Sequence, residues 1–396
     1  MLMLPLYVPL LVTATLACLG YLLAKQRAIA LSGGDIRSLA ALPHQYGLNT
    51  LLAITVPSLA VLLGGALAGG GSMLGWIVIG VATLCLIGSL AQISHDYRAR
   101  THAESWIKLL LIGASVIAIL TTVGIVFSML FETRNFFTQY SWQDFFFSAE
   151  WSPNFRGDSA LGILPLLWGT LYISFIALVF AVPTGMFAAI YLSEYASPRM
   201  RSIAKPAIEI LAGIPTIVYG LFALITVGPF LRDYFASPMG FGDSASSVMT
   251  AGLVMGIMLI PFVSSLSDDI INAVPQAMRD GSLGLGATKS ETIRQVVLPA
   301  ALPGVVGAIL LAASRAIGET MIVVLGAGAA ARLSLNPFEA MTTVTVKIVS
   351  QLTGDTDFAS PETLVAFALG LTLFVITLGL NVLALTIVRK YREQYE

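Results

Sequence analysis

The chain has 396 residues, of which 57% are hydrophobic and only 11% are charged, and its formal net charge is -1. Soluble proteins of average composition carry about 25% charged residues. This composition therefore excludes an ordinary soluble domain and predicts an integral membrane protein. The nearly neutral charge balance provides no basic surface of the kind that binds nucleic acid.

Nine apolar stretches are each long enough to cross a membrane as a helix, which takes about 20 residues. Lys25 and Arg27 follow the first stretch instead of preceding it, which favours a membrane span over a signal peptide. We therefore predict an all-α, polytopic bundle of about nine transmembrane helices. The stretches are approximately residues 4–24, 48–69, 73–93, 107–131, 162–192, 206–231, 248–267, 301–330 and 362–388.

The distribution of Lys and Arg orients these spans. With the N-terminus outside and the C-terminus in the cytoplasm, the inside segments hold fifteen of the 21 Lys and Arg residues and the outside segments hold five. The opposite orientation reverses this bias, so we expect a multi-pass protein of the bacterial inner membrane with its C-terminus inside. The outside segment 132–161 is rich in aromatic residues. We expect it to lie along the outer membrane surface, or alternatively to form a docking surface for an external partner.

A polar joint at Ser94–Ser105 divides the chain into two parts. The N-terminal part, residues 1–100, has three spans without an intramembrane charge and includes the turn Gly69-Gly70-Gly71, which suggests scaffolding or regulation. Residues 101–396 contain the other six spans and every unusual feature. The two cysteines, Cys18 and Cys85, lie in apolar runs and indicate small hydrophobic side chains. The three histidines lack metal-ligand spacing, so we expect no metal, cofactor or catalytic residue.

The longest inside loop, residues 268–300, has a readable local structure. Pro275 suits the first turn of a short helix over 276–283, and Gly284 and Gly286 would stop that helix. Thr288 and Glu291 form a capping box that would begin a second helix, which Pro299 would close. The loop is therefore predicted to be a helix, a glycine turn and a helix.

The same loop excludes ATP binding by this chain. Gly281 and Gly286 have the spacing of a phosphate-binding P-loop, but Ala287 stands where that loop needs lysine. Any ATP hydrolysis must therefore come from a separate subunit.

A charged pair lies inside the eighth stretch. Arg315 and Glu319 are four residues apart and would share one helix face. A charge near the bilayer centre costs roughly 2.5 kcal/mol or more, so these residues need an internal polar environment. They would form either an ion pair that fixes helix packing or a site on a substrate path. In the second case Ser314 and Thr320 would add hydroxyl donors, and Glu209 is a further candidate that more simply suits the membrane interface.

Several motifs together resemble the permease subunits of ABC importers for inorganic phosphate. The loop keeps the spacing of the permease signature, with Asp280-Gly281-Ser282 in place of Glu-Ala-Ala, followed by Gly286 and by Leu298-Pro299. The block Arg315-Ala-Ile-Gly-Glu319-Thr320 is the feature most characteristic of the phosphate branch. The resemblance spans approximately residues 107–388, and the three N-terminal spans resemble an extension of longer family members.

This resemblance implies a six-span type I importer core with a coupling helix in loop 268–300. The residues that would dock on the ATPase are Asp280, Gly281, Ser282, Gly286 and Thr288. Implied partners are a second, PstA-like permease subunit in a heterodimer, two copies of a cytoplasmic ATPase and an external phosphate-binding protein. The expected function is phosphate import. The alternatives are transport of another oxyanion such as sulfate or molybdate, a phosphate-sensing membrane scaffold and, more remotely, an integral-membrane enzyme.

Overall fold

The computed structural model describes residues 5, 7–33, 36–69, 73–154, 159–354 and 359–392. Within these residues the fold is helical apart from one two-stranded hairpin. Nine helices in the described part are long and apolar enough to cross a membrane, which confirms the predicted number. Gly70 and Gly71 of the predicted glycine turn lie outside the described residues.

The first compact unit, Met1–Gly124, is built on three packed helices. Helix α1 presents small buried residues at intervals of three and four positions, among them Ala17, Gly20 and Ala24. A Cβ on Gly20 would lie 2.8 Å from Cδ1 of Ile54 in α2, so the close approach of the helices requires small residues. The elements are α1 (Tyr7–Leu31), the 3-10 turn η1 (Ile36–Ser38), α2 (Pro43–Leu67), α3 (Leu74–Ala91) and the first part of α4 (Ala99–Gln139).

Helix α4 contributes to both compact units, because the division falls between Gly124 and Ile125. Its 41 residues correspond to about 60 Å at the rise of an α-helix, whereas the hydrocarbon core of a bilayer is about 30 Å thick. The helix begins at Ala99, within the polar joint, and includes the fourth predicted span. The division of the chain at residue 100 stays a prediction.

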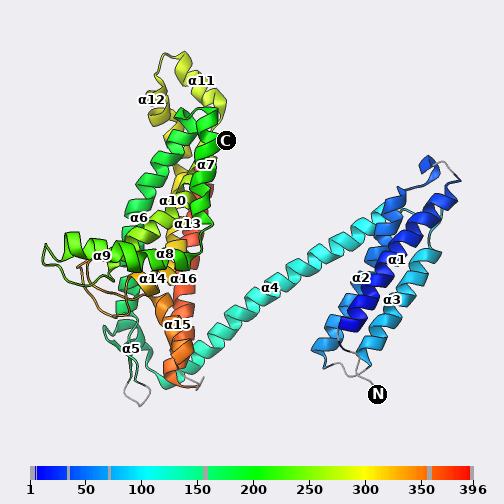
Figure 1. The fold of residues 1–396 in the computed structure, drawn as a ribbon, viewed down its shortest axis with the longest axis horizontal. Helices are drawn as coiled ribbons and strands as arrows, with labels where there is room; N and C mark the ends of the chain where they lie inside the picture. The colour runs from blue at the N-terminus through cyan, green and yellow to red at the C-terminus, as the bar shows by residue number, and fades with distance from the viewer. Residues whose placement is uncertain are drawn as a thin grey trace. The chain divides into compact units, whose positions relative to one another are not determined.

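The second compact unit, Ile125–Glu396, is centred on helices α6 and α10, which lie side by side (Figure 1). Buried Met255 and Leu259 of α10 belong to the main core cluster. A Cβ on Gly252 would lie 2.6 Å from Cγ2 of Ile176 in α6, so this interface also depends on small residues. Helices α11 and α12 lie at one end of the unit, and α5 lies at the other end (Figure 1).

The elements of this unit are short at both ends and long in the middle. They are α5 (Trp142–Phe147), β1 (Trp151–Ser152), β2 (Ala160–Leu161), α6 (Leu164–Ile190), η2 (Tyr191–Tyr195), α7 (Pro198–Ala212), α8 (Thr216–Phe222), η3 (Ala223–Val227), α9 (Gly228–Leu231), η4 (Arg232–Ala236), α10 (Val248–Asn272), α11 (Gln276–Gly284), α12 (Lys289–Thr292), η5 (Ile293–Val297), α13 (Leu298–Ile317), α14 (Met321–Gly326), α15 (Val344–Gly354) and α16 (Pro361–Arg392). The segments η2, η3, η4 and η5 are single π-helical turns.

The aromatic segment 132–161 is a folded cap and not a loop lying along the membrane surface. Phe136 and Phe145 are fully buried, and their rings meet edge to face with centroids 5.5 Å apart. Trp151 is buried in β1, which pairs antiparallel with β2. These rings pack against one another and against α16 side chains such as Leu369. The predicted surface loop was therefore wrong, because the rings gain more by forming a core; the docking alternative stays a prediction.

Two of the predicted spans are interrupted. The span expected over 206–231 is divided by Gly213 and Pro215, so that α7 ends at Ala212 and α8 begins at Thr216. Pro215 lacks the N–H that a continuing helix needs. The span expected over 301–330 ends at Ile317, where Gly318 caps α13.

Pro299 does not close the second helix of the inside loop, contrary to the prediction. The helix continues from Lys289 to Ile317 over 29 residues. The π-turn η5 lies directly before the proline, and the N–H of Leu298 donates to the carbonyl of Ile293. This local widening accommodates a residue that would otherwise clash with the preceding turn.

Substitution of Gly169 in α6 by alanine is expected to destabilise the second unit. Its added Cβ would lie 2.1 Å from the carbonyl oxygen of Thr342, and backbone must shift to relieve such overpacking at a cost of about 1–3 kcal/mol. The matched control is Gly379→Ala in α16, where a Cβ meets nothing within 4 Å. Thermal unfolding of the purified protein in detergent should show a lower Tm for Gly169→Ala alone. An equal Tm for both variants would contradict this packing.

Candidate functional site

The loop 276–292 has the predicted helix–turn–helix form. Helix α11 ends at Gly284, and Gly286 takes a φ of 90°, which favours glycine. The hydroxyl of Thr288 accepts from the N–H of Glu291, and the Glu291 carboxylate accepts from the N–H of Thr288 at 2.8 Å, so the capping box is confirmed. Leu285, at the tip, is 92% exposed. The loop is therefore ordered by its own residues and presents an apolar tip.

The five residues expected to dock on an ATPase are placed together on this loop. Asp280 accepts from the amide of Gln276 at 3.0 Å within α11. The hydroxyl of Ser282 lies 2.9 Å from that of Thr292, which ties α11 to α12. Gly281 has open space where a side chain would project. The structure thus brings the predicted residues into one short, rigid hairpin of helices.

Arg279 anchors α11 to the rest of the unit. Its Nη2 donates to the carbonyl of Ile271 in α10 at 2.6 Å and forms an ion pair with Glu194 of η2 at 3.2 Å. Both side chains of this ion pair are largely buried. The loop is therefore attached to the ends of α6 and α10 by charged contacts as well as by the chain itself.

A cavity of about 380 Å³ lies between α7, α8, α10 and α13, and Arg315 lines it. Pockets for small ligands start at roughly 300 Å³. Glu209 supplies a carboxylate to the same cavity, and Thr216 and Ser265 supply hydroxyls. Met258 and Phe262 contribute apolar wall, and the Arg315 guanidinium lies 5.9 Å from the Phe262 ring centroid. The cavity thus combines one cation, one anion and neutral donors on apolar walls.

Arg315 and Glu319 do not share a helix face, contrary to the prediction. Because α13 ends at Ile317, Glu319 turns away, and its Oε1 accepts from the backbone N–H groups of Thr320 and Met321 at 3.1 Å each. Among the described residues, Arg315 forms no ion pair. Glu319 therefore caps the start of α14, and the Arg315 charge is left for the cavity.

Of the four predicted substrate-path residues, only Arg315 lines this cavity. Ser314 is half-buried in α13, and its carbonyl accepts from the N–H of Gly318. Thr320 precedes α14 and makes no side-chain cap bond. A buried group of hydroxyls adjoins them: the hydroxyl of Thr345 donates to the Glu319 carbonyl at 2.8 Å and lies 2.9 Å from that of Thr343. Threonines within an otherwise apolar run were the only signal for this group.

Asp268, at the end of α10, is a buried carboxylate with several donors. Nη2 of Arg201 lies 3.0 Å from both carboxylate oxygens, and Nζ of Lys205 lies 2.8 Å from Oδ2. The Asp268 side chain is only 2% exposed. Its hydrogen bond raises the pKa of Lys205, which therefore stays charged at neutral pH. Nothing local marks Asp268 in the sequence, because its cationic partners are 63 and 67 residues away.

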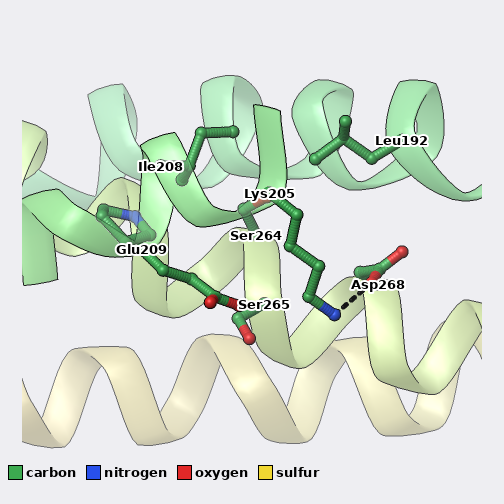
Figure 2. Close-up of a pocket in the computed structure, with 8 residues that line it drawn as sticks. Leu192, Lys205, Ile208, Glu209, Ser264, Ser265 and Asp268 are labelled. Atoms are coloured by element: carbon green, nitrogen blue, oxygen red, sulfur yellow. Dashed lines mark hydrogen bonds and ion pairs between the residues drawn. The ribbon is translucent and has the colours of Figure 1, made fainter. Parts of the chain in front are cut away.

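Glu209 is positioned by the same helix as these cations. Arg201, Lys205 and Glu209 follow one another at intervals of four residues on α7 and so share one face. Figure 2 shows Lys205 reaching Asp268 while Glu209 lies further along α7, beside Ser265. Glu209 therefore lines both this small pocket and the Arg315 cavity.

Comparison with known proteins gives the class of this chain. Residues 181–393, more than half of the chain, match the family described as "Binding-protein-dependent transport system inner membrane component". Residues 10–73 match a second family, described as "Phosphate ATP-binding cassette transporter". The chain therefore belongs to the binding-protein-dependent transport system inner membrane component family and is a multi-pass membrane permease.

Individual relatives agree with this assignment. The chain is 32% identical over 312 residues to the phosphate transport system permease protein PstC of Xylella fastidiosa, covering 74% of this chain and 93% of the relative. It is 36% identical over 278 residues to PstC 1 of Mycobacterium tuberculosis, covering 62% and 81%. A crystal structure of a bacterial alginate ABC transporter has a similar fold, with 17% identity, a TM-score of 0.50 and coverage of 72% and 95%.

Replacement of Thr288 by alanine is expected to loosen the start of α12. Loss of a threonine N-cap costs about 1 kcal/mol, so the amide hydrogens of residues 289–292 should exchange roughly fivefold faster. Ser290→Ala, which lies inside the same helix and removes a hydroxyl from an exposed residue, is the matched control. Hydrogen exchange read by mass spectrometry distinguishes the two. Equal exchange in both variants would show that the capping box does not hold the loop.

Proposed function

We propose that this chain is one of two permease subunits of an ATP-driven importer that carries inorganic phosphate into the cytoplasm. The observation that carries the proposal is a single arginine, Arg315, that lines a cavity between membrane helices without a carboxylate partner among the described residues. The relatives named as phosphate permeases support the choice of substrate.

The cavity suits a phosphate ion that must be bound and then released. The planar guanidinium of Arg315 donates two parallel hydrogen bonds to an oxyanion. Thr216 and Ser265 offer neutral hydroxyls in the same cavity, whose 380 Å³ also leaves room for bridging waters. Glu209 places a negative charge on the same wall space, and its repulsion of the anion limits how long phosphate stays.

Work on the cavity requires a motor that this chain does not contain. In the proposed assembly, two copies of a cytoplasmic ATPase receive the tip of loop 276–292, with Leu285 as its apolar contact. A second, PstA-like permease subunit completes the path as a heterodimer. A phosphate-binding protein delivers the ion at the end of the unit where α5 lies, opposite α11 (Figure 1). ATP binding and hydrolysis then switch the bundle between its two open states.

The proposed orientation places the N-terminus outside and the C-terminus in the cytoplasm. It rests on the bias of Lys and Arg, which favours the side that carries loop 276–292. We also propose that residues 1–100 are an extension with three spans and that residues 101–396 form the six-span core. The match of residues 10–73 to a separate family supports a distinct role for the extension.

Substitution Arg315→Gln is expected to abolish most phosphate uptake by the complete importer. A charged hydrogen bond contributes about 1.5–3 kcal/mol, so uptake should fall roughly tenfold to a hundredfold, and Arg315→Lys should fall between wild type and Arg315→Gln because it keeps the charge without the fork. Arg100→Gln, which removes an exposed arginine paired with Glu104 in the first unit, is the control. Labelled phosphate uptake into proteoliposomes measures all four proteins.

Competition in the same assay separates the alternatives. Excess unlabelled phosphate should suppress uptake, whereas excess sulfate or molybdate should leave it unchanged. Suppression by sulfate or molybdate alone would identify another oxyanion as substrate. Normal phosphate uptake by an assembled Arg315→Gln importer would remove Arg315 from the path, and an importer without this chain that still carries phosphate would support the sensing scaffold.

A further inference from the structure

We propose that Asp268 is a positioning residue of the transport cycle, which fastens helix α7 and its cavity residue Glu209 to the part of α10 that the coupling loop holds. Motion of α11 then reaches the charge that shares the cavity with Arg315. This inference rests on the proposed function, since it needs an ATPase that moves α11 and an anion that uses the cavity.

Helix α7 lacks an apolar attachment to the core. It has no buried residue, and apolar side chains such as Ile203 and Ile210 are exposed in this chain. It is also separated from α8 by the break at Gly213–Pro215. A helix without buried side chains must be held mainly by polar contacts.

The main polar contact of α7 is the pair of cations on Asp268. Arg201 meets both carboxylate oxygens, and Lys205 meets one of them. Asn272 of α10 donates to the third direction, with its amide 2.9 Å from Oδ1. Because a buried carboxylate without partners is strongly unfavourable, α7 cannot leave α10 while Asp268 stays charged and buried. The two helices therefore move together.

The coupling loop grips the same turn of α10. Arg279 of α11 donates to the carbonyl of Ile271, which lies three residues after Asp268. The same guanidinium pairs with Glu194 at the end of α6. Residues 268–272 are thus contacted by α11 on one side and by α7 on the other, which gives a continuous set of contacts from the loop to α7.

The far end of this set is the cavity. Glu209 follows Lys205 by one helical turn on the same face of α7 and lines the cavity together with Arg315. A rotation or shift of α7 changes the separation of Glu209 from Arg315, and so changes the net charge that an anion meets. Asp268 thereby sets the cavity through Glu209 without touching the substrate.

The test compares Asp268→Asn with Asp269→Asn in the complete importer reconstituted in proteoliposomes. Asp269 is the matched control, since its side chain is 67% exposed and lies 3.5 Å from Lys205. The measured quantity is phosphate taken up per ATP hydrolysed. Asp268→Asn should keep ATP hydrolysis but lower this ratio roughly tenfold, a change typical of coupling between sites, while Asp269→Asn should match wild type. A merely structural role would lower the amount of complex and leave the ratio unchanged.

A covalent replacement of the ion pair tests the same inference if Asp268→Asn assembles poorly. The variant carries Arg201→Cys and Asp268→Cys in a chain whose own Cys18 and Cys85 are replaced by serine. A reducible bifunctional thiosulfonate reagent then links α7 to α10. The uptake per ATP should be low before the link, should rise towards wild type after it, and should fall again on reduction.

Three results would overturn the inference: an unchanged ratio in Asp268→Asn, full coupling in the unlinked cysteine pair, or no recovery when the link forms. The failure of the proposed function looks different. In that case the wild-type importer itself would show no phosphate uptake above that of liposomes without protein.

Discussion

The cost of a charge in apolar surroundings governs the second unit. Its structure answers that cost in two ways. Asp268 is buried and is neutralised by Arg201 and Lys205. Arg315 is left without an ion partner among the described residues, and it is tolerated because it lines a cavity that polar groups and water can enter. A satisfied charge fixes the position of helices, whereas an unsatisfied one creates a place for an anion.

The interruptions of the helices make that second answer possible. Had α13 continued past Ile317, Glu319 would have shared a face with Arg315 and could have neutralised it. The break at Gly318 instead lets Glu319 accept from the first N–H groups of α14. Likewise the break at Gly213–Pro215 frees α7 from α8, so that Glu209 and Thr216 reach the cavity from two separate helices.

These breaks and pairings mark the limit of what the sequence predicts. The nine spans and the capping box of Thr288 and Glu291 follow from composition and from contacts three residues apart, so both were predicted. The end of α13 at Gly318 was not, since the apolar run continues through it. Nor was Asp268, whose partners come from another helix. The rings of Phe136 and Phe145 were assigned to the membrane surface because aromatic content alone does not distinguish an interface from a core.

The continuity of α13 gives the coupling loop a second connection to the cavity. Because η5 absorbs Pro299, one helix runs from Lys289, beside the tip of the loop, to Ile317, and it carries Arg315 near its end. Glu209 is connected to the loop by another route, through α7 and Asp268. The cation and the anion of the cavity are therefore held by two different arms of the same lever. Any motion of the loop that moves one arm more than the other alters their separation, which is the quantity that decides whether the cavity attracts or releases an anion.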